Sequence, residues 1–401
     1  MNILHTVEFY HPSVGGMQEV VRQLSERLVA LGHTVTVATT ALKERRENVH
    51  NGVHIRGFDV KGNLVRGIEG DRAAYEAFLL DGPFDVVVNF AAQQWTTDLA
   101  LPLLDRIKAR KVFVPTGFSG LPWPEYRDYF ERMKVWMKGY DMNVFLSDHY
   151  RDIDFARANG ITKTVLIPNG AGEDEFLAPG PVDIRQQLGI GPDQFLILHV
   201  GFFTGQKGQR EAWEMFRRAG LRNAVLLLVG QYSGSFRHWV RKQQSWWSRG
   251  LDALRGRRLV VAGLNRAETV AAFQAADLFL FPSNIECSPI VLFEAMAGKT
   301  PFLVTDVGNS AEIIGWTGAG ELLPTTHDEA GYSHADIDRG AVQLRELVAD
   351  RGKRERMALA GYQAWREKYS WEKIVKQYEV LYLNLCANEI NASVPEGTQS
   401  S

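Results

Sequence analysis

The sequence predicts an α/β protein made of two doubly wound parallel-sheet domains that face each other across a cleft. Three observations lead to this prediction. Short apolar runs alternate with amphipathic helical stretches in the first half of the chain, and the same alternation restarts in the second half. Between the halves, residues 168–192 are rich in proline and glycine. Strands that alternate with helices favour parallel sheets with helices on both faces.

The first half opens with an expected strand at residues 3–8, a glycine-containing loop and a helix. This helix places Val20, Leu24 and Leu28 on one face, and Gly32 ends it. Further strands are expected at residues 34–38, 85–90, 111–115, 143–147 and 164–167.

The second half repeats this arrangement. A strand is expected at residues 195–200, followed by a loop to Gly208 and a helix over 209–219. Ser370 is a suitable N-cap for a last amphipathic helix at 370–387. Later strands of this half are expected at residues 224–229, 259–262, 278–281 and 302–305.

Composition excludes several classes of protein. With 401 residues and a net charge of −2, the chain has no overall attraction to nucleic acid. Its two cysteines, Cys287 and Cys386, exclude a disulfide framework and favour a reducing compartment. The start does not resemble a signal peptide, and no apolar run approaches the roughly 20 residues that span a bilayer. A cytoplasmic protein is therefore expected.

The apolar run after residue 288 predicts a helix that begins with an anion site. Ser288 suits the N-cap, and Pro289 suits the first helical position because its missing N–H would have no partner there. The backbone N–H groups of Ile290 and Val291 then point out of the helix end. Anions bind well at such an end, so a phosphate site is expected.

Two glutamates lie on either side of this helix start. Glu286 precedes the cap, and Glu294 follows among apolar neighbours, where an unpaired carboxylate would be costly. A ribose diol would explain Glu294, and a sugar would explain Glu286. One glutamate for a sugar, a phosphate site and a second glutamate for a ribose suit a sugar-nucleotide donor. The alternative is that both carboxylates are solvated and complement the helix dipole.

Two further loops join a strand to a helix and carry candidate residues. At Gly15-Gly16 the backbone can approach a phosphate or a reacting sugar closely, although an ordinary tight turn is the alternative. Lys207 can neutralise a diphosphate leaving group, although a solvated loop lysine is the alternative. Neither loop has the full glycine fingerprint of dinucleotide enzymes, and Lys207 is followed by Gly208 instead of a magnesium-binding Ser or Thr.

These motifs resemble those of the retaining glycosyltransferases of family 4, which have the GT-B architecture of two Rossmann-like domains. The similarity rests on the glycine loop at 12–16, the hinge signature at 167–170, the Lys207-Gly208 pair and, most specifically, residues 276–301. The segment that begins at Ser370 resembles the last helix of the family, which usually crosses back onto the first domain. The match covers nearly the whole chain in the same order.

The resemblance gives the segments their expected places. They are an N-terminal Rossmann-like acceptor domain at 1–167, a hinge at 168–192, a C-terminal Rossmann-like nucleotide-sugar donor domain at 193–369, a helix at 370–387 that packs back on the first domain, and a disordered tail at 388–401.

The resemblance also implies roles for particular residues. Glu286 would hold the donor sugar, Glu294 the ribose, and backbone groups near Leu264 the base. The amides of Ile290 and Val291, with Lys207 and Gly16, would hold the diphosphate. The predicted substrate-binding residues are Gly15, Gly16, Thr116, Gly201, Lys207, Leu264, Glu286, Ser288, Pro289, Ile290, Val291 and Glu294, and of these Glu286, Lys207 and Gly16 are predicted to be catalytic.

No metal and no cofactor is expected beyond the nucleotide-sugar donor, because a lysine and a helix N-terminus can stabilise a departing phosphate without magnesium. The short motifs Asp152-Ile153-Asp154 and Asp336-Ile337-Asp338 are interpreted as chance matches to a metal motif. The chain departs from the family at two positions. Phe202 replaces a frequent arginine and Thr116 a frequent histidine, which bears on transfer efficiency and donor choice.

Residues 236–258 form a basic segment that contains three tryptophans and a single acidic residue, Asp252. Such a composition suits an anionic membrane surface or a lipid-linked acceptor. The alternative is a solvated insertion whose aromatic residues pack on the domain. Nucleic acid is not expected as a partner, because no other segment of this length has as large an excess of basic residues. The expected location is therefore cytoplasmic, with peripheral contact at the inner face of the membrane left open.

The sequence thus predicts a retaining, metal-independent glycosyltransferase of the hexosyltransferase type, active in polysaccharide, glycolipid or other glycoconjugate biosynthesis. Its partners would be a nucleoside diphosphate sugar and a carbohydrate, lipid-linked or other hydroxyl acceptor. Two alternatives stay open: an epimerase or hydrolase of the same fold, and a nucleotide-sugar-binding protein without transfer activity. A Rossmann oxidoreductase is disfavoured by the absent glycine fingerprint.

Overall fold

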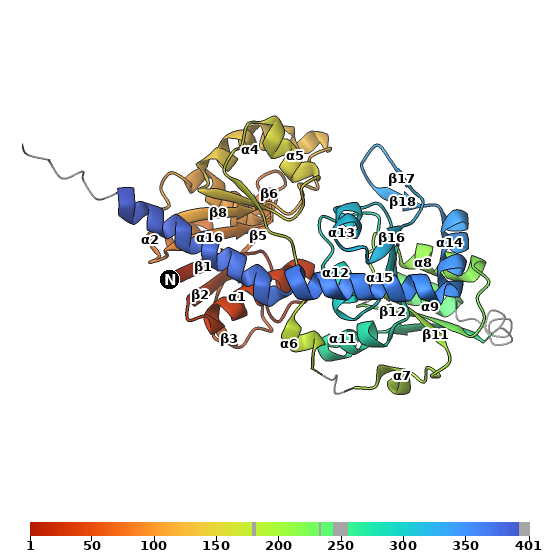
Figure 1. The fold of residues 1–401 in the computed structure, drawn as a ribbon. Helices are drawn as coiled ribbons and strands as arrows, with labels where there is room; N and C mark the ends of the chain where they lie inside the picture. Colours follow the sequence, from red (N-terminus) through yellow and green to blue (C-terminus); the bar gives the residue numbers. More distant parts are fainter. Residues whose placement is uncertain (179–181, 232–233, 244–255, 393–401) are drawn as a thin grey trace, which may run out of the picture. The chain divides into compact units, whose positions relative to one another are not determined.

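The chain forms two α/β units that are not divided at a single point (Figure 1). The computed structural model describes residues 1–178, 182–231, 234–243 and 256–392. The first unit comprises Met1–Pro168 and the C-terminal segment from Trp371 onward, and the second comprises Asn169–Ser370. Among the described residues, each unit contains one large sheet in which almost all strands are parallel, which confirms the predicted fold class.

The sheet of the first unit contains eight strands among the described residues, in the order β10-β9-β8-β7-β1-β2-β4-β3. All neighbours pair in parallel except β3, which is antiparallel to β4 at the sheet edge. Its strands are β1 (Asn2–Thr6), β2 (Thr34–Thr40), β3 (Val49–His50), β4 (Val53–Phe58), β7 (Val86–Phe90), β8 (Arg110–Val114), β9 (Met142–Phe145) and β10 (Thr164–Leu166). All five residues of β7 are buried, as expected for a central parallel strand that is covered on both faces.

The other elements of the first unit connect and cover this sheet. The strands β5 (Val60–Asn63) and β6 (Gly67–Gly70) form a separate antiparallel ribbon. The helices are α1 (Gly16–Ala30), α2 (Arg72–Asp81), α3 (Trp95–Ala100), α4 (Arg127–Gly139), α5 (Arg151–Ala158) and α16 (Trp371–Ala392), with short 3-10 turns at Leu101–Leu103 and Pro124–Tyr126.

The last helix, α16, belongs to the first unit, where it packs against α1. Tyr378 and Tyr382 of α16 are buried. Two contacts link α16 to α1 and to the turn after α1: the ion pair of Arg27 Nη2 with Glu372 Oε1 at 2.9 Å, and the hydrogen bond of His33 Nε2 with Glu379 Oε1 at 3.0 Å. The helix is longer than predicted, because it continues through residues 388–392, which were expected to be disordered. The rest of that predicted tail, 393–401, lies outside the described residues.

The sheet of the second unit contains six parallel strands among the described residues, in the order β13-β12-β11-β14-β15-β16. Successive side chains of β12 alternate between two apolar cores, Val225 and Leu227 in one and Leu226 and Leu228 in the other. Both faces of the sheet are therefore covered. Its strands are β11 (Phe195–Val200), β12 (Ala224–Val229), β13 (Arg257–Ala262), β14 (Leu278–Phe281), β15 (Phe302–Val304) and β16 (Gly320–Leu322), and a small hairpin adds β17 (Thr325–His327) and β18 (Ser333–Ala335).

Two short helices of the second unit, α6 (Glu173–Phe176) and α7 (Ile184–Gln187), precede its first strand, and the other helices come after strands. These are α8 (Gln209–Arg218), α9 (Gly234–Gln243), α11 (Arg266–Ala275), α12 (Ile290–Ala297), α13 (Ser310–Thr317), α14 (Ile337–Ala349) and α15 (Arg351–Ala364), with a π-helical turn at Trp365–Tyr369.

The stretch predicted as a hinge at 168–192 is mostly part of the second unit. Residues 169–178 and 182–192 contribute Ala171, Phe176, Ile184 and Ile190 to one of its apolar cores. Their proline and glycine content reflects turns around two short helices, so composition alone suggested a longer connection than the structure has. Every predicted strand is present, with ends that shift by no more than two residues.

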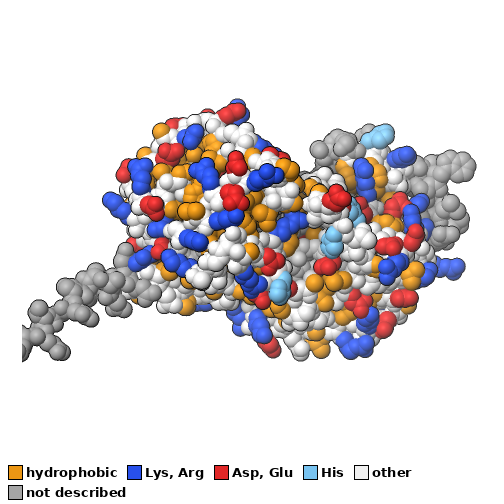
Figure 2. Space-filling view, turned by 90° about the horizontal axis from the view of Figure 1, so that it is seen from above, with side chains coloured by type: hydrophobic (Ala, Val, Ile, Leu, Met, Phe, Trp, Pro, Cys, Tyr) orange, Lys and Arg blue, Asp and Glu red, His pale blue; other side chains and the backbone are white. Residues whose placement is uncertain are grey.

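On the face shown in Figure 2, Lys and Arg side chains are interspersed with Asp and Glu, in keeping with the net charge of −2. None of the described helices is long and apolar enough to cross a bilayer.

Candidate functional site

Most of the predicted site residues of the second unit lie in loops at one edge of its sheet. Gly201 and Lys207 follow β11, Leu264 follows β13, and Glu286 follows β14. The strand order reverses between β11 and β14. In open α/β sheets, ligands bind outside the carboxyl ends of the strands at such a reversal. The loops after β11 and β14 are therefore the first place to look for a ligand site.

Lys207 and Glu286 form an ion pair in these two loops. Lys207 Nζ lies 2.6 Å from Glu286 Oε1, and Ser283 Oγ donates a hydrogen bond of 2.9 Å to the same oxygen. The side chain of Glu286 is 12% exposed and that of Lys207 is 27% exposed. Charge-assisted hydrogen bonds of this kind are about twice as strong as neutral ones. The predicted cation and the predicted sugar-binding carboxylate are thus held together and remain partly accessible.

Backbone contacts fix the loop after β14 against the lysine loop. The carbonyl oxygen of Gln206 accepts a hydrogen bond from the Asn284 amide at 2.8 Å, and Ser283 Oγ lies 3.2 Å from the same oxygen. Gly208 has a φ of +80°, and a Cβ at this position would lie 2.0 Å from the carbonyl oxygen of Pro282. Only glycine fits this crossing without moving the backbone.

The same loop is also fixed from its other side. The Asn309 amide donates to the carbonyl oxygen of Cys287 at 2.8 Å, and Asn169 Nδ2 donates to that of Ser288 at 2.9 Å. A Cβ on Gly308, whose φ is +56°, would lie 2.2 Å from the carbonyl oxygen of Cys287. Sequence reasoning missed these supporting residues, because their role is visible only once distant loops meet.

The helix start at α12 differs from the prediction by one position. Pro289 is the N-cap, with φ −70° and ψ 112°, and Ser288 does not cap the helix. Ser288 Oγ is buried and has no hydrogen-bond partner among the described residues. Ile290 and Val291 are half-buried and belong to the first turn, where a helix supplies no carbonyl for their amides. The N-terminus of α12 therefore keeps the backbone amides that an anion site requires.

Glu294 is buried, as its apolar neighbours suggested, but the protein itself supplies a partner. Arg266 Nη1 donates a hydrogen bond to Glu294 Oε1. The same guanidinium binds Glu175 with two hydrogen bonds, Nε to Oε1 at 2.9 Å and Nη2 to Oε2 at 2.6 Å. Burial alone therefore no longer requires a ribose diol at Glu294. One feature of the sequence points to Arg266: it lies two residues after Leu264, at the start of the helix that follows β13.

The remaining predicted residues of this unit lie near the pair of Lys207 and Glu286 or along the same edge. A Cβ at Gly201 would lie 3.3 Å from Lys207 Cβ, so glycine allows the lysine stem to pass closely. Gln209 Nε2 donates to the carbonyl oxygens of Gly201 and Phe202 at 3.1 and 3.0 Å. Leu264 is half-buried and packs against the apolar core.

In the first unit, Gly15 and Gly16 begin α1 after the loop that follows β1. A Cβ at Gly16 would meet no atom of the described residues within 4 Å, so its backbone is open on that side. Arg45 steadies the preceding loop, with Nε donating to the carbonyl oxygen of His11 at 2.7 Å and Nη2 to that of Tyr10 at 3.3 Å. The glycine loop is therefore anchored at its beginning and accessible at Gly16.

Thr116 lies in a region of backbone strain. Four non-glycine residues in the loops after β7 and β8 have left-handed φ angles: Ala91 at 62°, Gln93 at 64°, Thr116 at 60° and Phe118 at 47°. Each such residue costs about 1–3 kcal/mol and is retained mainly where function requires it. This clustering favours a functional role for the carboxyl edge of the first sheet, where Thr116 was predicted to act.

The two Asp-x-Asp motifs have structural roles in this fold. Asp152 Oδ2 accepts the Gly117 amide at 2.8 Å, and burial raises the pKa of Asp152 to about 6. Asp336 caps α14 by accepting the amides of Asp338 and Arg339. The described residues include no cluster of three or more His, Cys, Asp or Glu side chains that could hold a metal ion.

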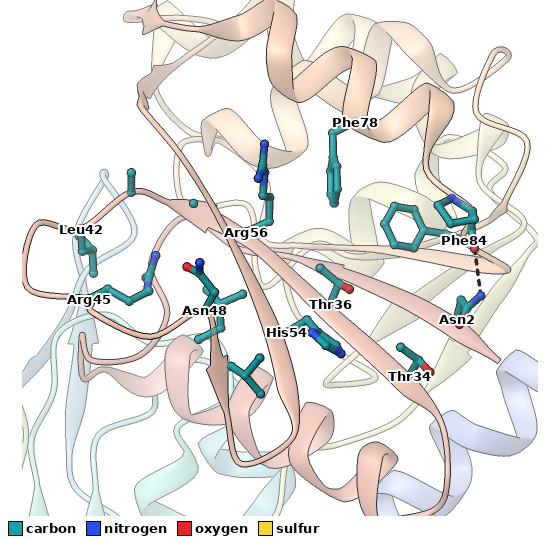
Figure 3. A pocket seen from close by; sticks show the side chains of 15 residues that line it. Asn2, Thr34, Thr36, Leu42, Arg45, Asn48, His54, Arg56, Phe78 and Phe84 are labelled. Carbon is teal, nitrogen blue, oxygen red and sulfur yellow. Dashed lines mark hydrogen bonds between the residues drawn. The ribbon is translucent and has the colours of Figure 1, made fainter.

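The first unit also has an open hollow of about 670 Å³ beside β2 and β4 (Figure 3). Thr34, Thr36, His54 and Arg56 extend into it from these strands, and Phe78 extends from α2. None of the predicted site residues lines it, so it is distinct from the loops described above.

The basic segment at 236–258 is only partly described, since residues 244–255, which include Trp246 and Trp247, lie outside the described residues. In α9, Phe236 and Val240 are buried. The ring centroids of Trp239 and Phe236 lie 4.7 Å apart, and Trp239 packs against an apolar core of the second unit. This tryptophan therefore supports the fold.

Two family models match the chain and together include most of it. The model of glycosyltransferase family 4 matches residues 14–174, and the model of group 1 glycosyl transferases matches residues 182–364. The first match ends and the second begins near the boundary of the two structural units.

Individual relatives are distant. The chain is 28% identical to the alpha-maltose-1-phosphate synthase of Mycobacterium tuberculosis over 246 residues, which are 55% of this chain and 57% of that one. It therefore spans little more than half the length of this relative and of similar synthases. A longer match, 26% identical over 93% of this chain and 87% of the relative, is to a D-inositol 3-phosphate glycosyltransferase of a Nocardioides species.

Solved structures match the fold over nearly the whole chain. The sucrose-phosphate synthase of Thermosynechococcus elongatus has a TM-score of 0.77 at 20% identity, covering 96% of this chain and 99% of that one. At this identity the similarity is evidence for the fold alone.

Proposed function

The chain belongs to glycosyltransferase family 4, and from that premise we propose that it transfers a glycosyl group from a nucleotide-sugar donor to an acceptor hydroxyl with retention at the anomeric carbon. The bond from the anomeric carbon to the diphosphate oxygen breaks, and the diphosphate leaves with the electron pair. A bond from the anomeric carbon to the acceptor oxygen forms on the same face. The acceptor proton goes to the leaving phosphate oxygen, so the protein need not supply a nucleophile.

The observation that carries this proposal is the ion pair of Lys207 and Glu286. Glu286 lies in the loop that leads into α12, and Lys207 reaches it from the loop after β11. A diphosphate that reaches this edge is offered an ammonium and the first-turn amides of a helix, which are groups that stabilise a departing anion. These groups can stabilise the leaving diphosphate without a metal ion. When Lys207 turns to the diphosphate, Glu286 becomes available to sugar hydroxyls.

The other predicted residues of the second unit take the remaining parts of the donor. Glu294 is proposed to accept the ribose hydroxyls, and backbone groups at Leu264 to contact the base. Gly201 lets the Lys207 stem lie close to the β11 loop. Ser288 and Pro289 shape the turn that exposes the amides of Ile290 and Val291. Ser288 acts in this proposal through the loop backbone, since it does not cap the helix.

The first unit is proposed to serve the acceptor. Gly15 and Thr116 lie in loops that follow strands of its sheet, Gly16 begins α1, and strained backbone surrounds Thr116. The relatives differ in what their names say they make or modify, so the acceptor is proposed only as a carbohydrate, a lipid-linked compound or another hydroxyl compound. Peripheral contact with an anionic membrane through residues 236–258 stays part of the proposal.

A thermal-shift panel of UDP, GDP, ADP and their glucose and N-acetylglucosamine derivatives tests donor binding. A ligand at 100 times its Kd stabilises the folded protein by about 2.7 kcal/mol, so the correct nucleotide should raise the melting temperature clearly. Product analysis with the stabilising sugar nucleotide and a set of acceptors then tests transfer. Glu286→Ala should still bind the nucleotide and lose transfer by about 100-fold or more.

Three results would contradict the proposal. No stabilisation by any member of the panel would contradict nucleotide-sugar recognition, and near-normal transfer by Glu286→Ala would contradict the role of that carboxylate. Tight binding without transfer to any acceptor would instead favour a sugar-nucleotide-binding protein, the alternative that Phe202 and Thr116 suggest.

A further inference from the structure

A guanidinium links two carboxylates of the second unit that are far apart in the sequence. Arg266 is the first residue of α11, Glu294 lies in α12 and Glu175 lies in α6. The helix α11 packs against both α12 and α6. Arg266 donates one hydrogen bond to Glu294 and two to Glu175. From this arrangement we propose that Arg266 is a positioning residue for the ribose site: it orients Glu294, and Glu175 in turn holds Arg266.

This inference rests on the proposed function, in which Glu294 accepts the ribose hydroxyls. The side chain of Glu294 is only 5% exposed, and burying a carboxylate is costly unless it is paired. Arg266 supplies that pairing. A carboxylate has roughly four acceptor directions, so a bond from Arg266 and bonds from ribose hydroxyls are compatible at the same group.

The role of Glu175 follows from the shape of the guanidinium. Its two parallel hydrogen bonds, at 2.9 and 2.6 Å, fix both the position and the plane of Arg266. With Nε and Nη2 bound to Glu175, Nη1 is directed to Glu294. A lysine has no such fork and could not bind both carboxylates in this geometry.

The three side chains differ in exposure. Arg266 is 33% exposed, Glu175 16% and Glu294 5%, so the guanidinium that contacts the buried Glu294 is itself accessible to solvent. A ribose that binds there would meet a carboxylate already oriented by its neighbour. Preorganisation of this kind raises affinity because the carboxylate loses little freedom when the ligand binds.

The test compares ribonucleotides with deoxyribonucleotides. The full-length wild type, Arg266→Ala, Arg266→Lys and Glu175→Gln are titrated by calorimetry with UDP, GDP and ADP, and then with the 2′-deoxy and 3′-deoxy forms of the nucleotide that binds. Arg266→Ala should weaken binding of the ribonucleotide by about 10- to 100-fold and change the deoxy forms much less. Arg266→Lys should not restore the preference, and Glu175→Gln should give an intermediate loss.

A matched control removes an arginine ion pair elsewhere in the same unit. Arg218 Nη1 binds Asp338 Oδ1 at 2.7 Å, and both side chains are exposed. Arg218→Ala should keep the wild-type ribose preference and a similar melting temperature. If Arg266→Ala does not fold, the ribose preference of Glu175→Gln decides the question.

The possible failures are distinguishable. If Arg266→Ala keeps the wild-type ribose preference, or loses ribonucleotide and deoxyribonucleotide binding equally, the positioning role is wrong while the proposed function stands. If the wild type binds no nucleoside diphosphate, the proposed function is wrong and this inference falls with it.

Discussion

The Nζ atom of Lys207 and the Oε1 atom of Glu286 lie 2.6 Å apart, although the two residues are in loops that follow different strands. Each side chain had been assigned a separate role, the cation for a diphosphate and the carboxylate for a sugar. The structure places them in one hydrogen-bonded pair with Ser283. Phosphate recognition and sugar recognition are therefore expected to be coupled, because the ammonium that would bind a diphosphate also contacts the carboxylate that would bind the sugar.

Lys207→Ala should weaken nucleoside diphosphate binding by about 10- to 100-fold, because a charge-assisted hydrogen bond to the phosphate is lost. Calorimetric titration with the diphosphate identified by thermal shift measures this. Lys134→Ala is the matched control, since Lys134 forms an exposed ion pair with Glu131 at 2.7 Å and should not affect binding. Equal affinity in the wild type and Lys207→Ala would rule out a phosphate contact for Lys207.

Gly308→Ala should reduce transfer more than Gly220→Ala does, although both variants strain the backbone to a similar extent. The new Cβ at position 308 would lie 2.2 Å from the carbonyl oxygen of Cys287 and 3.0 Å from the carbonyl carbon of Glu286, so the loop that carries Glu286 must move. Gly220→Ala is a close control, because Gly220 also has a left-handed φ, +66°, but no atom of the described residues within 4 Å of a Cβ. In both variants the left-handed backbone lowers the free energy of unfolding by about 1 kcal/mol.

Steady-state assays and thermal melts separate the two effects of Gly308→Ala. We expect a drop in kcat for this variant and none for Gly220→Ala. Similar activities in the two variants would show that the contact of Gly308 with the Glu286 loop does not matter for transfer.

Asp98→Asn should remove part of the pH dependence of stability, so that the variant gains stability relative to the wild type as the pH rises from about 4 to about 7. Asp98 is buried and accepts hydrogen bonds from Tyr129 Oη at 2.7 Å and from the Leu64 amide at 2.8 Å. Burial raises its pKa from 3.8 to about 6. A carboxyl whose pKa is higher in the folded state binds more protons there, so the protein loses stability as the pH rises from about 4 to about 6.

The asparagine variant has no such proton to lose. Its free energy of unfolding, relative to that of the wild type, should rise by at most about 3 kcal/mol between about pH 4 and about pH 7. Urea denaturation of both proteins at about pH 4.5 and about pH 7.5 measures the difference in their free energies of unfolding. If this difference does not grow with pH, the raised pKa of Asp98 is wrong.

Tyr378→Ala in α16 should destabilise the protein strongly, because Tyr378 is 2% exposed in the core of the first unit. Truncation of a large buried aromatic side chain costs about 3–5 kcal/mol. Val380→Ala is the control on the same helix, since Val380 is 54% exposed and its truncation should cost about 0.5 kcal/mol or less. Equal denaturation midpoints for the two variants would mean that α16 is not part of this core.

Much of the fold was predictable because its signals are local. The apolar runs at β11, β12 and β14 predicted their strands without error in the bounds, since buried parallel strands are continuously apolar. Polar or very short strands were missed. Examples are β5, β6, β17 and β18, whose composition is that of loops and which owe their pairing to a neighbouring segment.

Candidate site residues could be selected from the sequence, but the side chains that they contact could not. Lys207 and Glu286 were selected for their strand-end loops and Glu294 for its apolar neighbours, and their roles stay predictions. The cap at Ser288 was wrong, because Pro289 takes that position in the folded turn. Arg266 was missed as the partner of Glu294, since the two residues come together only when α11 packs against α12.

By itself, the sequence determined the alternation of strands and helices, the parallel sheets and the positions of the glycines and carboxylates along the chain, because periodicity and residue type act over a few neighbouring residues. Only the tertiary structure decided that residues 169–178 and 182–192 join the second unit, that α16 joins the first, and that Lys207 pairs with Glu286 and Arg266 with Glu294. Those outcomes depend on which distant surfaces exclude water together and which buried charges must then be paired, and neither condition exists until the chain has folded.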